Sequence, residues 1–214
     1  MAERIPSHAE NAADGVVHAA GIVSSFVAIS LLLSVYMPQG TVGMSLALMV
    51  YGLSVVMLFC ASAANNLVTR EDWQPLLQRF DHAAIYLKIA GTYTPLVVMM
   101  GSMFANAILA LIWAGAAIGA ALRLGFAGRF ARQSVWLYLL LGWGGIAVLW
   151  VMVEKFPPGA TALVLAGGIL YTVGVLFHVR ESLKFQRAIW HSFVLAASSC
   201  HFIAVAWTSL GSLA

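Results

Sequence analysis

Residues 41–65 read TVGMSLALMVYGLSVVMLFCASAAN, a stretch without a single charged side chain. A helix needs roughly 20 apolar residues to cross the hydrocarbon core of a bilayer. The stretch shows no alternation of apolar and polar residues, which argues against a barrel strand. Inside lipid the backbone must satisfy its own hydrogen bonds, as a helix does. We therefore predict a transmembrane helix here.

Six further apolar runs of similar length flank this one. They are residues 15–36, 82–101, 103–124, 134–153, 159–178 and 188–211. The 214-residue chain is 62% hydrophobic and only 9% charged, unlike a soluble domain. No connector is long enough to separate two domains. We expect an all-α membrane protein, one seven-transmembrane-helix bundle over residues 1–214, surrounded by membrane lipids.

The basic residues of the connectors predict the orientation of the bundle. The connectors on one side, after the second, fourth and sixth spans, share their basic character with the N-terminal segment. Together they hold Arg4, Arg70, Arg79, Arg123, Arg129, Arg132, Arg180, Lys184 and Arg187. The connectors on the opposite side hold only Lys155. Cytoplasmic loops carry the excess of Lys and Arg, so we expect the N-terminus inside and the C-terminus outside. The formal charge of +3 is then a topology signal and does not indicate a nucleic-acid partner. We expect the connector 66–80 to lie along the inner surface.

Polar and ionisable residues gather at the predicted cytoplasmic ends of the spans, although such groups are costly in a membrane. They are Asp14, His18, Ser62, Asn65, Asn66, Asp81, His82, His178, Arg187 and His191. A spacing of four places Ser62 with Asn66, and Arg187 with His191, on shared helical faces. Taken alone, each could be an ordinary helix-end residue. Together they predict one polar cavity that opens toward the cytoplasm.

Two ionisable residues lie deeper in the predicted spans. Lys88 follows Asp81 by about two helical turns, and it would either snorkel to the surface or pair with a carboxylate. His201 lies about 15 Å beyond His191 by helical rise, too far to share a coordination shell with it. We interpret it as a packing histidine, with a proton relay as the alternative.

The segment RFDHAAIYLKIAGTYTP, residues 79–95, resembles the signature of the hemolysin III proteins. These are the bacterial branch of the progestin and adiponectin receptor family, which is related to the alkaline ceramidases. Residues 10–21 (ENAADGVVHAAG), 59–67 (FCASAANNL) and 188–202 (AIWHSFVLAASSCHF) carry the same resemblance over the whole chain. It implies a multi-pass protein of the bacterial inner (cytoplasmic) membrane.

The resemblance also implies a zinc site near the cytoplasmic face. Its ligands are a histidine that closes the second span and two histidines four apart at the start of the seventh. An aspartate of the third span acts on a zinc-bound water, beside a serine of the second span. Position by position, Ser62, Asp81 and His191 match, as do Glu10 and His18. Asn66 and Arg187 stand where the family has histidines, and Asp14 stands where it has an asparagine.

The departures affect metal binding. Asn66 offers a weakly basic amide oxygen and Arg187 a permanent cation at positions where the family has histidines. His191 and Asp81 remain, and a tight zinc site would need new ligands from His82, His178 or His18. Alternatively, Arg187 replaces the charge of the metal and pairs with Asp81. On ligand count we favour a metal-poor or metal-free site over an intact one.

Three functions follow as hypotheses. The first is lipid sensing or membrane homeostasis, with a degenerate metal site and a lipid-like ligand. The second is a zinc-dependent hydrolase of a lipid amide or ester, in which Asp81 acts as the base and Ser62 positions the substrate. The third is a proton- or ion-coupled carrier that uses Asp81, Lys88 and His201. The sequence leaves enzymatic activity and oligomeric state open.

Overall fold

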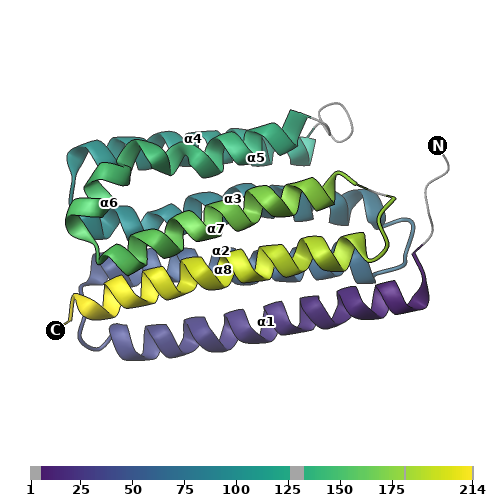
Figure 1. Ribbon diagram of the computed structural model, residues 1–214, viewed down its shortest axis with the longest axis horizontal. Helices are drawn as coiled ribbons and strands as arrows, with labels where there is room; N and C mark the ends of the chain where they lie inside the picture. The colour runs from purple at the N-terminus through teal and green to yellow at the C-terminus, as the bar shows by residue number, and fades with distance from the viewer. Residues whose placement is uncertain (1–5, 126–132, 181, 214) are drawn as a thin grey trace.

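The computed structural model describes residues 6–125, 133–180 and 182–213, and for residues 133–135 only the backbone. These residues form helices and no strand (Figure 1). The elements are α1 His8–Tyr36, α2 Val42–Leu67, α3 Gln74–Met100, α4 Met103–Gly125, α5 Gln133–Trp143, η1 Gly144–Val148, α6 Leu149–Lys155, α7 Pro158–His178 and α8 Gln186–Gly211. Arg4, Arg129 and Arg132, which entered the orientation argument, lie outside the described residues.

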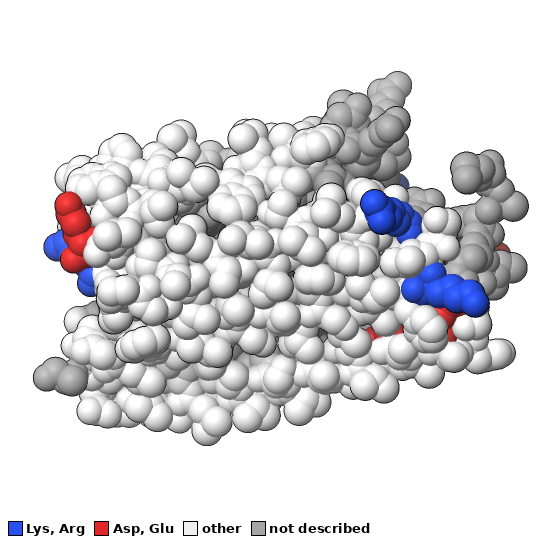
Figure 2. Space-filling view, viewed as in Figure 1, with Lys and Arg blue, Asp and Glu red and all other residues white. Residues whose placement is uncertain are grey.

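Seven helical segments of the described chain are long and apolar enough to cross a membrane, with residues 136–155 counted as one. Their outward side chains are apolar; Met103, for example, is 86% exposed and Val42 77% exposed. On the face shown in Figure 2, charged side chains gather near the two ends and leave the broad middle uncharged. The prediction of a seven-helix membrane bundle is confirmed.

The helices α2 and α3 pack closely along their length, and α1, α4 and α8 pack against this pair (Figure 1). The largest apolar core includes Leu48 and Tyr51 of α2, Leu96 of α3 and Val205 of α8, all 1% exposed or less. Helix α7 packs mainly on α8. As a result, the first turns of α1, α3 and α8 and the last turn of α2 meet at one end of the bundle, near the N-terminus in Figure 1.

Two helices begin earlier than the apolar runs predict. Helix α1 begins at His8 rather than residue 15, because Ser7 and Glu10 form a capping box. Helix α3 begins at Gln74 rather than residue 82, with Pro75 in its first turn, where the missing N–H is not needed. Residues 74–80 of the connector 66–80 therefore extend α3 beyond its apolar run.

The fifth span is interrupted, which its apolar run does not predict. A 3₁₀ segment, Gly144–Val148, separates α5 from α6. The hydroxyl of Tyr93 on α3 accepts the N–H of Gly145 at 3.0 Å and donates to the carbonyl of Gly142. A side chain at Gly145 would meet the Tyr93 ring. The Tyr93 hydroxyl of α3 thus takes the place of backbone hydrogen bonds that a continuous helix would form at this point.

Candidate functional site

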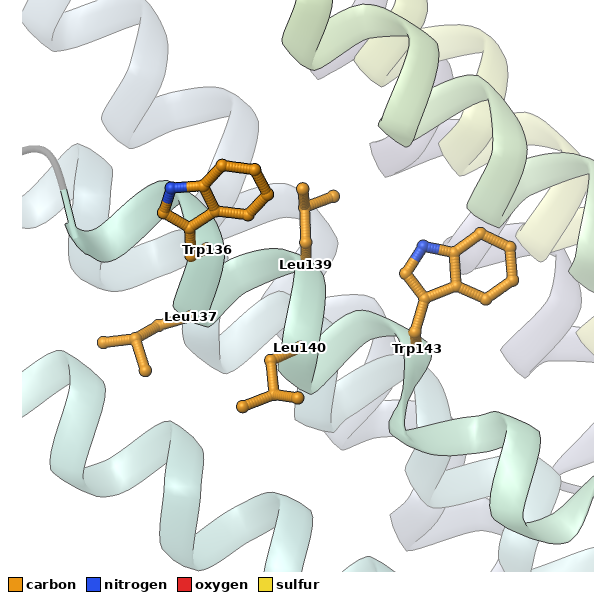
Figure 3. Close-up of a pocket in the computed structure, with 5 residues that line it drawn as sticks. All are labelled: Trp136, Leu137, Leu139, Leu140 and Trp143. Carbon is orange, nitrogen blue, oxygen red and sulfur yellow. The ribbon is translucent and has the colours of Figure 1, made fainter.

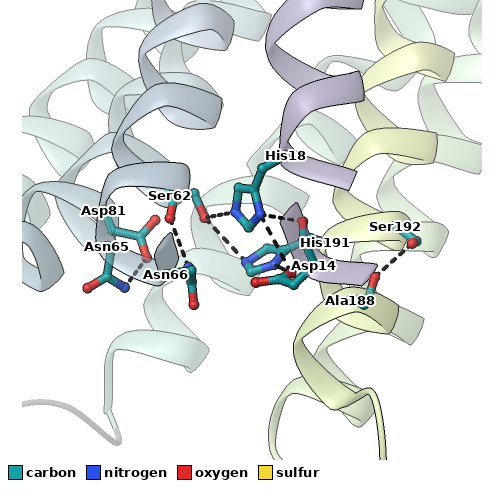
Figure 4. Close-up of polar contacts among 9 residues, drawn as sticks. All are labelled: Asp14, His18, Ser62, Asn65, Asn66, Asp81, Ala188, His191 and Ser192. Carbon is teal, nitrogen blue, oxygen red and sulfur yellow. Dashed lines mark hydrogen bonds and ion pairs between the residues drawn. The ribbon is translucent and has the colours of Figure 1, made fainter. Parts of the chain in front are cut away.

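Four buried polar side chains meet at the end of the bundle where α1 begins (Figure 4). Asp14 and His18 come from α1, Ser62 from α2 and His191 from α8. Their exposed fractions are 2%, 1%, 7% and 8%, so all four are withdrawn from the surface. Ligand-type atoms of Asp14, His18 and His191 lie within 4.8 Å of one another. We call these four residues the polar cluster.

A continuous path of hydrogen bonds joins the polar cluster. His191 Nδ1 lies 2.6 Å from Asp14 Oδ1, and His191 Nε2 lies 3.3 Å from Ser62 Oγ. His18 Nδ1 lies 2.8 Å from the backbone oxygen of Asp14, and His18 Nε2 lies 3.2 Å from the same Ser62 Oγ. The ring centroids of the two histidines are 4.3 Å apart. Asp14 and Ser62 are therefore bridged twice, once through each imidazole.

The partners of the two histidines fix their tautomers. A carbonyl oxygen and a carboxylate oxygen only accept, so both Nδ1 atoms carry the proton. In the neutral rings each Nε2 is then an acceptor, and both face the Ser62 hydroxyl. That hydroxyl has one proton, and the Asp81 carboxylate is a third acceptor beside the two imidazoles. The hydroxyl can therefore donate to no more than one of the two imidazoles at a time.

Glu10 sets the register of α1 against α8. Its Oε2 accepts the N–H of Ser7 at 2.8 Å within the capping box, and its Oε1 accepts the N–H of Phe185 at 2.7 Å. Phe185 is the N-cap of α8 and has a left-handed backbone conformation, with φ 58°. Asp14 is one turn beyond Glu10, and His191 is in the second turn of α8. The contact between Glu10 and Phe185 therefore brings Asp14 and His191 together.

The approach of α1 to α2 depends on a glycine. A Cβ added to Gly21 would stand 2.4 Å from the ring of Phe59, a residue 3% exposed. Gly21 follows His18 by about one turn, and Phe59 precedes Ser62 by the same interval. The absent side chain thus lets His18 reach Ser62.

Asp81 is a second carboxylate close to the polar cluster. Its Oδ2 accepts a hydrogen bond from Asn65 Nδ2 at 2.9 Å. It interacts with the side chain of Ser62 and, electrostatically, with His191. Figure 4 shows Asp81 and Asn65 on the side of Ser62 away from the two imidazoles.

The two residues that replace family histidines do not enter the polar cluster. The Nδ2 of Asn66 donates to the Ser62 backbone carbonyl of its own helix at 2.9 Å. Arg187 is exposed, and within the described chain no ion pair joins it to Asp81. The pairing of Arg187 with Asp81 that the sequence allowed is therefore absent from the structure.

Of the three histidines that could supply new metal ligands, only His18 joins the polar cluster. The ring of His178 packs on Trp190, with centroids 4.9 Å apart. His82 lines the wall of the adjoining cavity, and its backbone carbonyl accepts a hydrogen bond from Tyr138.

Three residues of the polar cluster suit a metal ion better than the positions where the resemblance implies zinc ligands, two of which are Asn66 and Arg187. Asp14, His18 and His191 supply one carboxylate and two imidazoles, a donor set typical of catalytic zinc sites. Sequence reasoning placed Asp14 and His18 in the cavity without proposing Asp14 as a ligand. The sequence signal for this pair is the spacing of four between Asp14 and His18, which puts both on one face of α1.

The polar cluster adjoins a large cavity of about 1810 Å³. Ser62, His18, His191 and Asp81 line this cavity, whereas Asp14 does not. Its other polar lining residues include Glu10, Asn66, His82, Lys88, His178 and Arg187. Farther from the polar cluster the wall becomes largely apolar, with side chains of α3, α5 and α7. The cavity thus joins a polar end to an apolar interior.

An apolar depression on α5 borders the large cavity (Figure 3). Its lining is Trp136, Leu137, Leu139, Leu140 and Trp143, without an ionisable group. Trp136, Leu139 and Trp143 also line the large cavity. The depression therefore offers contact to acyl chains and no chemistry of its own.

Lys88 and His201 form a pair in the interior of the bundle. Lys88 Nζ lies 3.4 Å from His201 Nδ1 and 4.3 Å from the centroid of the Tyr171 ring. His201 Nε2 faces the carbonyl of Val164 at 3.2 Å, so Nδ1 is the acceptor for Lys88. Among the described residues Lys88 has no carboxylate partner. It lines the cavity and is 3% exposed, so it does not snorkel to the surface.

Comparisons with known proteins agree with this architecture. The family described as haemolysin-III related matches residues 8–202. The chain is 36% identical to Hemolysin-3 of Bacillus cereus, covering 92% of this chain and 90% of the relative. It is 31% identical to the Hemolysin-3 homolog of Bacillus subtilis (strain 168), covering 92% of each. A more distant relative is the human monocyte to macrophage differentiation factor, 26% identical over 94% of this chain and 84% of the relative.

The family resemblance read from residues 79–95 is confirmed. The family match begins in the first turn of α1 and ends within α8, so it covers nearly all of the seven-helix bundle. This multi-pass membrane protein belongs to the haemolysin-III related family.

Proposed function

We propose that this protein is a membrane-embedded hydrolase that cleaves an ester or amide bond of a lipid. The observation that carries the proposal is the polar cluster, whose hydroxyl and imidazoles line a cavity with largely apolar walls. A hydroxyl, two imidazoles and a nearby carboxylate can accept and return protons during acyl transfer. An apolar interior beside these groups suits the acyl chain of a lipid.

Asp14, His18 and His191 are the residues that would hold a metal ion. A bound divalent metal polarises a carbonyl oxygen and activates water. Asp81, close to Ser62, is suited to orient a water molecule and to take its proton. The hydrogen bond from Asn65 holds the Asp81 carboxylate in place.

A second candidate is a lipid sensor without chemistry. Asn66 and Arg187, at positions where the resemblance implies ligand histidines, favour it. Asn66 is bonded to its own helix and Arg187 is exposed. A sensor would keep the cavity and bind a lipid without turnover.

We also propose that the polar-cluster end faces the cytoplasm of a bacterial inner membrane. Arg70, Arg180 and Lys184 lie in the connectors at that end, whereas Lys155 ends α6 at the other. This asymmetry supports the positive-inside orientation. In a background without Cys60 and Cys200, an impermeant thiol reagent applied to intact cells should label Glu154→Cys and spare Glu71→Cys. The reverse pattern would invert the proposed orientation.

Hydrolysis is tested with the full chain in lipid nanodiscs. Mixed phospholipids and ceramides are supplied, and released fatty acids are measured by mass spectrometry. We expect release to fall by roughly 10²-fold or more in Asp14→Asn, because the His191 imidazole loses its charged partner. Ser192→Ala is the control, since Ser192 Oγ donates to Ala188 of its own helix (Figure 4). Fatty acid release no greater than from empty nanodiscs, with lipid bound in the cavity, would replace the hydrolase with the sensor.

A further inference from the structure

We infer that Ser62 is a nucleophile, activated by His191 and Asp14, and that it attacks an acyl group without a metal ion. This inference rests on the proposed hydrolytic function and assigns it a mechanism that uses Asp14 and His191 without a metal ion, in place of the metal-assisted route. Asp14 Oδ1, His191 Nδ1, His191 Nε2 and Ser62 Oγ follow one another at 2.6 Å and 3.3 Å across the two hydrogen bonds. A carboxylate that orients an imidazole, which in turn faces a hydroxyl, is the arrangement of Ser–His–Asp hydrolases.

The triad is recognised by geometry, because its members come from three helices. They occur along the chain in the order Asp14, Ser62, His191. The same three roles occur on unrelated folds with different chain orders. The order of the residues therefore carries no weight against the assignment.

The hydroxyl of Ser62 behaves differently from those of most other serines of α2 and α8; Ser198, which contacts the Tyr171 hydroxyl, is another exception. The hydroxyls of Ser45, Ser54 and Ser192 each donate to a backbone carbonyl three or four residues earlier. This is the ordinary way for a serine to satisfy itself within a helix. Ser62 Oγ instead faces the two imidazole Nε2 atoms and also interacts with the Asp81 carboxylate of α3. The Ser62 hydroxyl therefore contacts side chains of other helices, including His18 of α1 and His191 of α8.

The burial of the three residues matches their roles. Ser62 and His191 line the cavity, where a substrate would lie, whereas Asp14 stands behind His191 and away from the cavity wall. A nucleophile and its base must reach the substrate, while the orienting carboxylate needs only the imidazole. Asp14 occupies a position where the resemblance implies an uncharged asparagine, so this chain has gained the charge that orients the base.

Asn66 completes the site as a donor to the developing oxyanion. It lines the cavity one turn after Ser62. One of its two amide hydrogens is committed to the Ser62 carbonyl, which leaves the second for a substrate oxygen. Amide side chains serve in this way in other acyl-transfer sites. The substitution that weakens the family's metal site therefore supplies a part that a serine hydrolase needs.

The reaction balances without an oxidant or a metal. Ser62 Oγ forms a bond to the acyl carbon, its proton passes to His191 Nε2, and the carbonyl electron pair moves onto oxygen. The intermediate expels the alcohol or amine, which takes the proton from His191 and leaves an acyl ester on Ser62. Water then attacks this ester, gives a proton to His191, and the proton returns to Ser62 as the fatty acid departs. Asp14 remains a carboxylate throughout.

A metal ion at the polar cluster would compete with this chemistry. A metal ion held by Asp14 and His191 would replace the hydrogen bond between them, which orients the imidazole toward Ser62. Zinc is therefore expected to inhibit, and chelation to leave the activity unchanged. A metal-dependent hydrolase responds in the opposite way.

The test is covalent labelling of the purified full chain in nanodiscs with a fluorophosphonate probe. With EDTA present, we expect one adduct, which peptide mass spectrometry maps to Ser62. Labelling should be lost in Ser62→Ala, slowed by roughly 10³-fold in His191→Gln, and unchanged in Ser192→Ala. Zinc should slow labelling of the unaltered protein. Adduct mapping on the unaltered chain does not depend on whether a variant folds.

The outcomes separate the mechanism from the function. Lipid hydrolysis that survives Ser62→Ala and requires zinc would overturn the triad and leave the hydrolase standing. Labelling of Ser62 without release of fatty acid from any lipid supplied would support the triad and reject the lipid substrate. Absence of an adduct at Ser62 in a protein that hydrolyses lipid would also overturn the triad.

Discussion

The hydrogen bond between Asp14 and His191 should be among the stronger polar contacts between helices in this bundle. We propose a double-mutant cycle with Asp14→Asn and His191→Gln, which keep the side-chain size and remove the charge or the ring. The two atoms are 2.6 Å apart, and the two side chains are 3% and 10% exposed. Water therefore screens the contact weakly.

The size of the coupling follows from these observations. Hydrogen bonds to charged groups contribute about 1.5–3 kcal/mol to stability. Hydrogen bonds between membrane helices average only ~0.6 kcal/mol, because the unfolded chain in the membrane finds other partners. The charge of Asp14 and the short distance place this pair in the upper range. We expect a coupling free energy of about 2 kcal/mol.

The assay measures the free energy of unfolding in bicelles for the unaltered protein, both single variants and the double variant. A neutral pair offers a matched control: Trp113 Nε1 donates to Thr94 Oγ1 at 3.1 Å between α4 and α3. The cycle of Trp113→Phe and Thr94→Val should give ~0.6 kcal/mol. A coupling for Asp14 and His191 no larger than that of the control would refute the reasoning and remove the orienting role of Asp14.

Three further predictions concern packing and buried charge. Gly21→Ala should lower the free energy of unfolding by about 1–3 kcal/mol, because its Cβ would stand 2.4 Å from the ring of Phe59. Gly43→Ala is the control and should not lower the free energy of unfolding, because nothing lies within 4 Å of its Cβ. An equal effect of the two substitutions would contradict the packing argument. Glu10→Gln should cost about 1–2 kcal/mol and speed hydrogen exchange at the N-cap amide of α8, whereas unchanged protection of that amide would rule out the α1–α8 contact. Lys88→Met should leave the free energy of unfolding unchanged or raise it by about 1 kcal/mol or more, since no carboxylate of the described residues compensates the buried ammonium; a clear loss in thermal unfolding would show that the ammonium is net stabilising.

Local sequence accounts for most of the fold because membrane insertion depends on the summed hydrophobicity of each segment. All seven spans follow from their apolar runs. The early start of α1 also has a local cause, the Ser7–Glu10 capping box, although apolarity alone does not reveal it. The break at Gly144–Val148 differs, because the hydroxyl that replaces its ladder belongs to Tyr93, on another helix.

The composition of the polar cluster depends on tertiary structure. The sequence by itself determined that polar groups of several spans lie near one membrane surface, because their depth follows from position along each helix. Which of them touch depends on the rotation and register of α1, α2 and α8, which close packing at Gly21 and the contact of Glu10 with Phe185 decide. Only the assembled bundle could show that His191 meets Asp14, 177 residues away, while Arg187, one turn earlier on the same helix, is exposed.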